Sequence, residues 1–329
     1  MDIELLRERA RIIKLVRTFF NEKKQYLETD TPLLAPDLIP ESCLEVFETK
    51  RLEPQGSMKQ ARSYWLIPSP EIWMKRLISQ HKQNIFQICK CFRNGESSGK
   101  FHSPEFTMLE YYTMNADYAD SLKITEELFT WLLVNESGAA WCGNQNNFSA
   151  PFVRLTIEEA FSQFAGFSLF DAAEDPAALE KEAARLGLNP MSGLTVQQLY
   201  DLIFIHSVEP SLPKDKPVVL MDYPAFVPCL AKKKPDNKTV ERWELYIDGI
   251  ELANCFSEET SADEVKNFFE KEKTEKDKHA LIRHSVDENY WKMFQGTPQC
   301  SGVAMGLDRL IMVLCGRSTI DSVLPFPMN

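Results

Sequence analysis

Two apolar segments separated by a polar, glycine-containing stretch constrain the fold of this chain more than any other feature. Residues 85–92 form a short apolar run typical of a buried strand, and residues 106–112 have the pattern of a second strand. The polar residues between them, 94–100, predict a hairpin with a long loop. We therefore expect these two strands to lie side by side in an antiparallel sheet.

Other segments carry helical or strand patterns of their own. Helices are predicted from apolar periodicity over residues 2–24, 72–79, 120–134, 157–165, 176–186, 195–206, 261–278 and 307–314. Strands are predicted over residues 26–34, 64–67, 217–222 and 243–253, the last being a hairpin that turns at Asp248-Gly249. Pro32 indicates an edge or interface for the first of these strands, and residues 35–62 are expected to be mostly loop.

This order of elements predicts an α+β fold with an antiparallel sheet flanked by helices. No internal repeat or low-complexity linker divides the chain. We therefore expect one catalytic domain over residues 1–329, with a helical insertion at about 170–215. A chain of 329 residues is long enough to bury a substantial core.

Composition excludes several classes of protein. No apolar run approaches the ~18–20 residues that a membrane span needs, and the N-terminus lacks the pattern of a signal peptide. The net charge of -11 argues against a non-specific nucleic-acid binder. The eight cysteines contain no C-x-x-C pair, and the five histidines have no zinc-ligand spacing with them. We therefore expect reduced thiols, a cytoplasmic location and no zinc site.

The loop between the first two strands carries a candidate nucleotide site. Arg93 follows the buried strand, and an arginine there can bind a phosphate through its forked guanidinium group. Phe106 on the second strand offers a flat face for a purine ring. The alternative is a surface arginine and a core phenylalanine in an ordinary hairpin, and this segment alone does not decide between them.

Two acidic residues mark a candidate metal site. Glu244 and Glu251 lie seven residues apart across the predicted hairpin. If the strands pair there, both carboxylates can reach one magnesium ion, which binds through one or two carboxylates and substrate phosphates. A solvent-facing pair of glutamates is the alternative, and the spacing alone favours it.

A third segment combines small residues with a helix start. Gly302 and Gly306 allow a ligand to approach the backbone closely. The helix that follows places Arg309 in its first turn, where the helix N-terminus also favours anions. The alternative is a glycine turn before a core helix.

In their order along the chain and in their amino-acid sequence, these three segments resemble motifs two and three of the class II aminoacyl-tRNA synthetases. Residues 104–110 (Pro-Glu-Phe-Thr-Met-Leu-Glu) are similar to the lysyl-tRNA synthetase group, as are residues 70–77 and 254–258. Residues 27–33 resemble motif one, with Pro32 as its dimer-interface proline. The resemblance spans essentially the whole chain. It implies a class II catalytic core that forms a homodimer.

The resemblance also implies a particular branch of the family. Lysyl-tRNA synthetases carry an anticodon-binding β-barrel before motif one, whereas here the helix of motif one begins within a few residues of Met1. Residues 249–254 and 300–306 are similar to the synthetase paralogues that lysylate translation elongation factor P. This implies activation of (R)-β-lysine, or lysine, as an aminoacyl-adenylate and transfer to a lysine side chain of the factor. There are two alternatives. One is a stand-alone enzyme that charges tRNA, although tRNA is the less expected partner. The other is an inactive regulatory binding module.

The resemblance implies a role for each matching residue. Arg93 and Arg309 would be catalytic. ATP would contact Arg93, Asn94, Glu96, His102, Ser103, Phe106, Glu251, Leu252, Gly306 and Arg309. The amino acid would contact Ser69, Pro70, Glu71, Glu110, Tyr112, Asn254, Glu258 and Ala304, with Glu258 and Tyr112 at its terminal amine. Glu244 and Glu251 would hold Mg²⁺.

Three positions depart from the family pattern. Gly95 stands where the family has a glutamate, so that Glu96 comes one residue late. Cys255 replaces the usual glycine after Asn254. Ala304 stands where lysyl-tRNA synthetases have glycine, and one extra methyl group in a tight pocket can exclude a substrate at a cost of roughly 1–3 kcal/mol.

Overall fold

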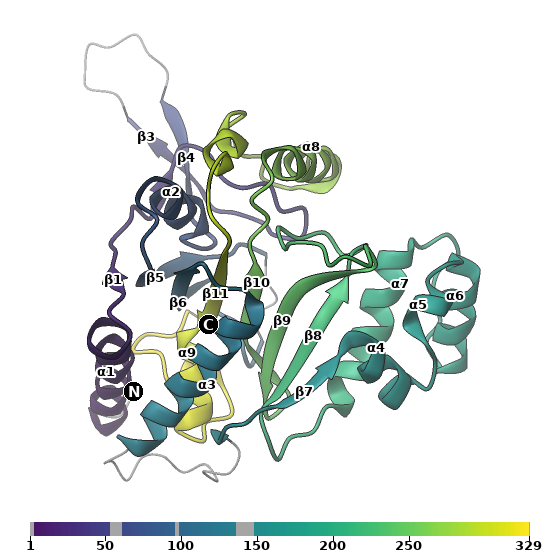
Figure 1. Ribbon diagram of the computed structural model, residues 1–329, viewed down its shortest axis with the longest axis horizontal. Helices are drawn as coiled ribbons and strands as arrows, with labels where there is room; N and C mark the ends of the chain where they lie inside the picture. The colour runs from purple at the N-terminus through teal and green to yellow at the C-terminus, as the bar shows by residue number, and fades with distance from the viewer. Residues whose placement is uncertain (1–2, 53–60, 96–98, 136–147, 329) are drawn as a thin grey trace.

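The computed structural model describes residues 3–52, 61–95, 99–135 and 148–328. An eight-stranded sheet lies at the centre of this part of the chain, in the order β1-β5-β6-β11-β10-β9-β8-β7 (Figure 1). In that order the strands are Leu27–Glu28, Ile85–Phe92, Glu105–Met114, Cys300–Gly306, Ile250–Ser257, Thr239–Ile247, Val218–Pro224 and Val153–Thr156. A smaller sheet has the order β2-β4-β3, with strands Leu34–Ala35, Arg62–Leu66 and Glu48–Arg51.

The predicted α+β class is confirmed, and the main sheet is mixed rather than wholly antiparallel. Its interior pairs, from β5 across to β8, are all antiparallel. The two edge pairs, β1 with β5 and β7 with β8, are parallel. The predicted hairpin of residues 85–92 and 106–112 is present as β5 and β6, in which Phe92 lies opposite Glu105.

One face of the main sheet is covered by helices α1 (Ile3–Thr18), α3 (Tyr118–Val134) and α9 (Leu307–Leu314) (Figure 1). Their apolar side chains form one core with residues that alternate along the strands, among them Tyr111, Val303 and Cys255. Successive side chains on a strand point to opposite faces. The intervening residues of β6, β11 and β10 therefore face the other side of the sheet, where the candidate site lies.

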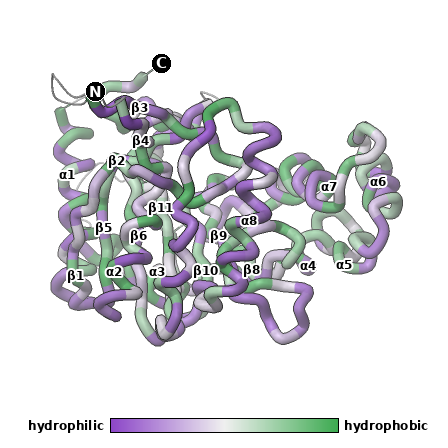
Figure 2. The backbone as a smooth tube through the Cα atoms, turned by 90° about the horizontal axis from the view of Figure 1, so that it is seen from above, coloured by the Kyte–Doolittle hydropathy of each residue, from purple (hydrophilic) through white to green (hydrophobic). Residues whose placement is uncertain are grey.

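Helices α2 (Glu71–His81) and α8 (Ala262–His279) lie on the side of the candidate site. Met74 and Ile78 of α2 pack with Tyr112 and Cys300 of the sheet. Helix α8 is largely hydrophilic (Figure 2), and its few apolar side chains join the core beneath the smaller sheet. Glu71 of α2 and Phe268 and Glu272 of α8 contribute to the walls of the site.

A helical region between β7 and β8 has a core of its own. It contains α4 (Ile157–Ala160), α5 (Leu169–Ala172), α6 (Pro176–Arg185) and α7 (Val196–Ile203). Seen from above, it lies at the opposite end of the molecule from α1 (Figure 2). Among the described helices, none combines the length and the apolar character needed to cross a membrane.

One prediction about local structure is wrong. The strand over residues 26–34 is reduced to the short strands β1 and β2, since Pro32 has no N–H group to donate. Residues 35–62, expected to be mostly loop, also contain β3, whose four residues are all exposed and so give no apolar pattern. The alternative of a glycine turn is excluded for Gly302, because residues 300–306 form β11 in the middle of the sheet.

Candidate active site

One row of side chains crosses four strands on the open face of the sheet. In the strand register, Glu110 of β6 is opposite Ala304 of β11, which is opposite Asn254 of β10, which is opposite Glu244 of β9. Opposed residues on neighbouring strands lie on the same face. The sheet therefore gathers four predicted site residues from distant parts of the sequence into one line.

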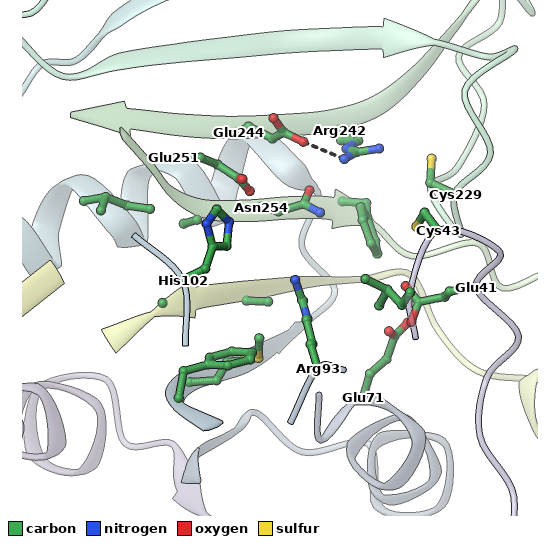
Figure 3. A pocket seen from close by; sticks show the side chains of 18 of the residues that line it. Glu41, Cys43, Glu71, Arg93, His102, Cys229, Arg242, Glu244, Glu251 and Asn254 are labelled. Atoms are coloured by element: carbon green, nitrogen blue, oxygen red, sulfur yellow. Dashed lines mark hydrogen bonds and ion pairs between the residues drawn. The ribbon is translucent and has the colours of Figure 1, made fainter. Parts of the chain in front are cut away.

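A β-bulge adds Glu251 to this face. The pairing of β10 with β9 shifts between Glu251 and Ala253, where two residues of β10 oppose one residue of β9. Residues three apart on a regular strand face opposite sides. With the extra residue Leu252 between them, Glu251 and Asn254 both face the cavity (Figure 3).

A cavity of about 750 Å³ opens above the row. Its walls include the predicted ATP ligands His102, Ser103, Phe106, Leu252, Gly306 and Arg309 as well as Arg93. The guanidinium carbon of Arg93 lies 5.3 Å from the centre of the Phe106 ring. Figure 3 shows Arg93 on the opposite side of the cavity from Glu244, Glu251 and Asn254.

Arg309 is fixed at the start of α9. Its Nε donates to the carbonyl of Phe101 at 3.0 Å, and its Nη1 donates to the carbonyl of Glu251 at 2.7 Å. The preceding Asp308 is buried, accepts a hydrogen bond from the N–H of Thr107 at 2.6 Å and pairs with Arg9 at 2.6 Å. These contacts tie α1, β6 and the start of α9 together, so that the Arg309 charge is held at the cavity wall.

A smaller, deeper pocket of about 90 Å³ continues from this cavity. Its walls include the predicted amino-acid ligands Ser69, Glu71, Glu110, Tyr112, Asn254, Glu258 and Ala304. Three of them present buried acceptor oxygens that have no hydrogen-bond partner in the described structure: Oε2 of Glu110, Oδ1 of Asn254 and Oε1 of Glu258. Such acceptors are costly without donors. The pocket thus suits a ligand with several N–H groups.

Burial sets the protonation behaviour of the deep pocket. Burial raises the pKa of Glu258 to about 7. The positive charge of Lys75 lowers this pKa, and the negative charge of Glu71 raises it. Burial and the charge of Glu71 raise the pKa of Glu110 well above its usual range, although it accepts a 2.7 Å hydrogen bond from the Tyr112 hydroxyl. A cationic ligand would stabilise the ionised form of both carboxyl groups.

Glycine is required at position 302 by its neighbours. A Cβ atom built there would lie 2.6 Å from Cε1 of Tyr112 and closer still to Oε1 of Glu258. The bare backbone of β11 therefore forms the pocket floor between these two side chains.

Comparison with known proteins agrees with this geometry. A sequence model of the class II tRNA synthetases (D, K and N) matches residues 3–329. The chain belongs to this family. It is also 36% identical, over 330 aligned residues that cover all of this chain and 96% of the relative, to a protein of Avibacterium paragallinarum named elongation factor P–(R)-β-lysine ligase.

Two acidic residues, Glu244 and Glu251, line the large cavity of this class II tRNA synthetase chain. Oε2 of Glu244 accepts hydrogen bonds from the hydroxyl groups of Tyr223 and Tyr246, and Oε1 pairs with Arg242 at 2.5 Å. Glu251 is more open, with a side chain that is 41% exposed. Enclosure within the site and the nearby Glu244 charge raise the pKa of Glu251 to about 7.

These two carboxylates fit a hard divalent cation. The partly exposed carboxylate of Glu251 and one remaining lone pair of Glu244 Oε1 are oxygen ligands of the kind that such an ion binds. The described residues contain no group of three or more His, Cys, Asp or Glu side chains suited to a metal. Any magnesium ion here would therefore take its other ligands from phosphate and water.

Some predicted site residues occupy other positions. The backbone N–H of Asn94 donates a hydrogen bond to the Glu45 carbonyl at 3.0 Å. Asn94 does not line either cavity. Pro70 precedes the first residue of α2 and also lies outside both linings. Glu96 lies outside the described residues. Their assignment as ligands stays a prediction.

Several charged residues of the site were assigned no role from the sequence, among them Lys75, Glu41 and Arg242. Lys75 lies beneath the deep pocket between Glu71 and Glu258. Glu41 lines both cavities, and Arg242 pairs with Glu244. The spacing of Glu71 and Lys75, four residues apart on a predicted helix, is the one signal in the sequence that points to this set.

Proposed function

We propose that this protein activates (R)-β-lysine, or lysine, with ATP and transfers the resulting acyl group to a lysine side chain of translation elongation factor P. The observation that carries this proposal is the deep pocket, in which buried acceptor oxygens without donors surround a space next to Arg93. A diamino acid supplies two ammonium groups to such a pocket. The name of the Avibacterium relative supports the isomer and the protein acceptor.

In the first step, the carboxylate of the amino acid attacks the α-phosphorus of ATP. The bond to pyrophosphate breaks and an aminoacyl-adenylate forms. Arg93 would neutralise charge that develops on the α-phosphate, and Arg309 would hold the γ-phosphate or the outer face of adenine. Phe106 would stack on adenine, with His102 near the phosphates. Placing the two reactants in line supplies much of the rate, without a covalent enzyme intermediate.

The amino-acid side chain would extend into the deep pocket. Glu258 and Tyr112 would bind its distal ammonium group, and Glu110 would face it from β6. Ser69, Glu71 and Asn254 would line the part nearer to Arg93. A magnesium ion held by Glu244 and Glu251 would neutralise the phosphates of ATP when it is bound.

We further propose a homodimer formed along the edge that carries β1 and β2. Leu27, Leu33 and Leu34 are exposed on this edge at 60%, 37% and 46%. Exposed apolar residues beside the outer edge of a sheet are a common site of association. We also propose a single catalytic domain with the helices between β7 and β8 as an insertion, and a cytoplasmic location.

The proposal is tested with radiolabelled (R)-β-lysine or lysine, ATP and either elongation factor P or tRNA. The expected result is ATP–pyrophosphate exchange with label on the factor. Label on tRNA and none on the factor would contradict the proposal and favour the tRNA-charging alternative. If no lysine isomer supports exchange, the chain is instead an inactive binding module.

A further inference from the structure

Glu41 differs from most other acidic residues of the site in the contacts of its carboxylate. Most cavity carboxylates are engaged: Glu71 and Glu258 with Lys75, Glu110 with Tyr112, Glu244 with Arg242, Glu272 with the N–H of Ser42, and Asp308 with Arg9. The carboxylate of Glu41 makes no hydrogen bond or ion pair with another described residue. Asp201 shares this property, but it lies on α7 and feels the charge of Arg242 instead.

Glu41 lies where the two cavities meet. It lines both the large cavity and the deep pocket, and so does Arg93 (Figure 3). The reacting carbonyl must lie at this junction, because the amino-acid chain extends into the deep pocket and the nucleotide fills the large cavity. Cys43 and Leu44, which follow Glu41, line the large cavity, through which an acceptor side chain must arrive.

The backbone of Glu41 is firmly held. Lys276 of α8 donates to the carbonyl groups of Glu41 and Leu44 at 2.9 and 2.6 Å, and Glu272 accepts from the N–H of Ser42 at 2.8 Å. The side chain therefore projects from a fixed turn.

We propose that Glu41 is the general base of the transfer step, a role that rests on the proposed function above. The acceptor lysine arrives as an ammonium ion and gives one proton to the Glu41 carboxylate. Its neutral nitrogen attacks the acyl carbon and forms the C–N bond, while the C–O bond to the phosphate breaks. The second proton on nitrogen moves to the departing phosphate oxygen, so that AMP and an amide result, and Glu41 later returns its proton to water.

The charges around Glu41 suit this exchange of protons. Burial and the carboxylate of Glu71 raise the pKa of Glu41 to about 7, opposed by Arg93, Lys276 and Lys75. The other titratable groups nearby are Cys43 of the same turn and Glu272 of α8. A base with a pKa near the working pH is about half ionised and is still basic enough to accept the proton.

The test separates the two half-reactions in a Glu41→Gln variant. Pyrophosphate exchange with (R)-β-lysine is expected to change by no more than a few-fold. Single-turnover transfer from the preformed adenylate to elongation factor P is expected to fall about 10²–10⁴-fold at pH 7. Wild-type transfer should rise with pH and level off above about 7. Transfer by the variant should keep rising about tenfold per pH unit, because it depends on free acceptor amine.

Two further measurements keep the outcome decisive. Hydroxylamine is already neutral at pH 7, so it should trap the adenylate at similar rates in Glu41→Gln and wild type. Glu270→Gln, an exposed position on α8, serves as the matched control and should transfer normally. Equal loss of exchange and transfer would make Glu41 an amino-acid ligand and overturn the proposal, as would unchanged transfer. Wild-type protein that forms the hydroxamate but never labels the factor would refute the proposed function and this step together.

Discussion

The Nζ atom of Lys75 lies 2.7 Å from Oε2 of Glu258, beneath the deep pocket. The same atom lies 2.5 Å from Oε1 of Glu71, and the Lys75 side chain is only 1% exposed. Burial alone would lower the pKa of Lys75, but the charges of Glu258 and Glu71 outweigh it and raise that pKa well above its usual range. One internal cation therefore joins two carboxylates of the pocket and leaves Oε1 of Glu258 for a ligand.

Replacing Lys75 with methionine should destabilise the protein by about 3–5 kcal/mol, because two buried carboxyl groups would lose their common partner. The free energy of unfolding in urea measures this effect. Lys278→Met is the matched control, since Lys278 forms an exposed pair with Glu275 on α8 and should contribute about 0–1 kcal/mol. A Lys75→Met protein as stable as this control would show that the triad is not a structural element.

Binding of the amino acid should release a proton near neutral pH. The pKa of Glu258 is about 7 without ligand, and an ammonium group beside it favours the ionised carboxylate. Affinity should therefore be about tenfold weaker at pH 6 than at pH 8, where the carboxyl group is already ionised. Calorimetric titrations in buffers of different ionisation enthalpy measure both the Kd and the proton release.

Glu258→Gln is the control for this pH dependence. The variant should bind the amino acid more weakly at every pH, with a flatter pH profile, because the neutral amide cannot titrate. Wild-type affinity that is constant from pH 6 to pH 8, with no proton released, would rule out titration of this carboxyl group on binding.

Local sequence determined some elements closely. Residues 85–92 are apolar enough to be recognised as a buried strand, and β5 has these same bounds. The Asp248-Gly249 turn is equally local, because both residues have positive φ, 54° and 73°, as a tight hairpin turn requires. Patterns of this kind need no knowledge of distant segments.

The site depends on relationships that a single segment does not carry. The bulge at Leu252 decides which side of β10 faces the cavity, and no turn residue marks it in the sequence. Lys75 and Glu41 belong to the site only because α2 and the turn before β3 are packed against the sheet. The resemblance to class II synthetases supplied the predicted ligands on the strands, whereas these additional charges required the tertiary structure.

Ala304 should control which lysine isomer is accepted. It lies between Glu110 and Asn254 in the row across the sheet and lines both cavities. Ala304→Gly removes one methyl group, so the specificity ratio between (R)-β-lysine and lysine should move towards lysine by about 10–200-fold. Pyrophosphate exchange with each isomer gives this ratio. An unchanged ratio would mean that the methyl group does not contact the amino acid. The control is Ala119→Gly, on α3 outside both cavity linings.

Glu251 should set the magnesium requirement of adenylate formation. It is the more open of the two acidic residues, whereas Glu244 is held by Arg242 and two tyrosine hydroxyl groups. Glu251→Gln should raise the Mg²⁺ concentration for half-maximal exchange by about ten- to a hundredfold, because a charged ligand is lost. Since protons compete with the metal, wild-type protein should also need more Mg²⁺ below pH 7 than above it. The control is Glu288→Gln, at an exposed position, which should leave the Mg²⁺ dependence unchanged. An unchanged Mg²⁺ dependence in Glu251→Gln would exclude Glu251 as a metal ligand.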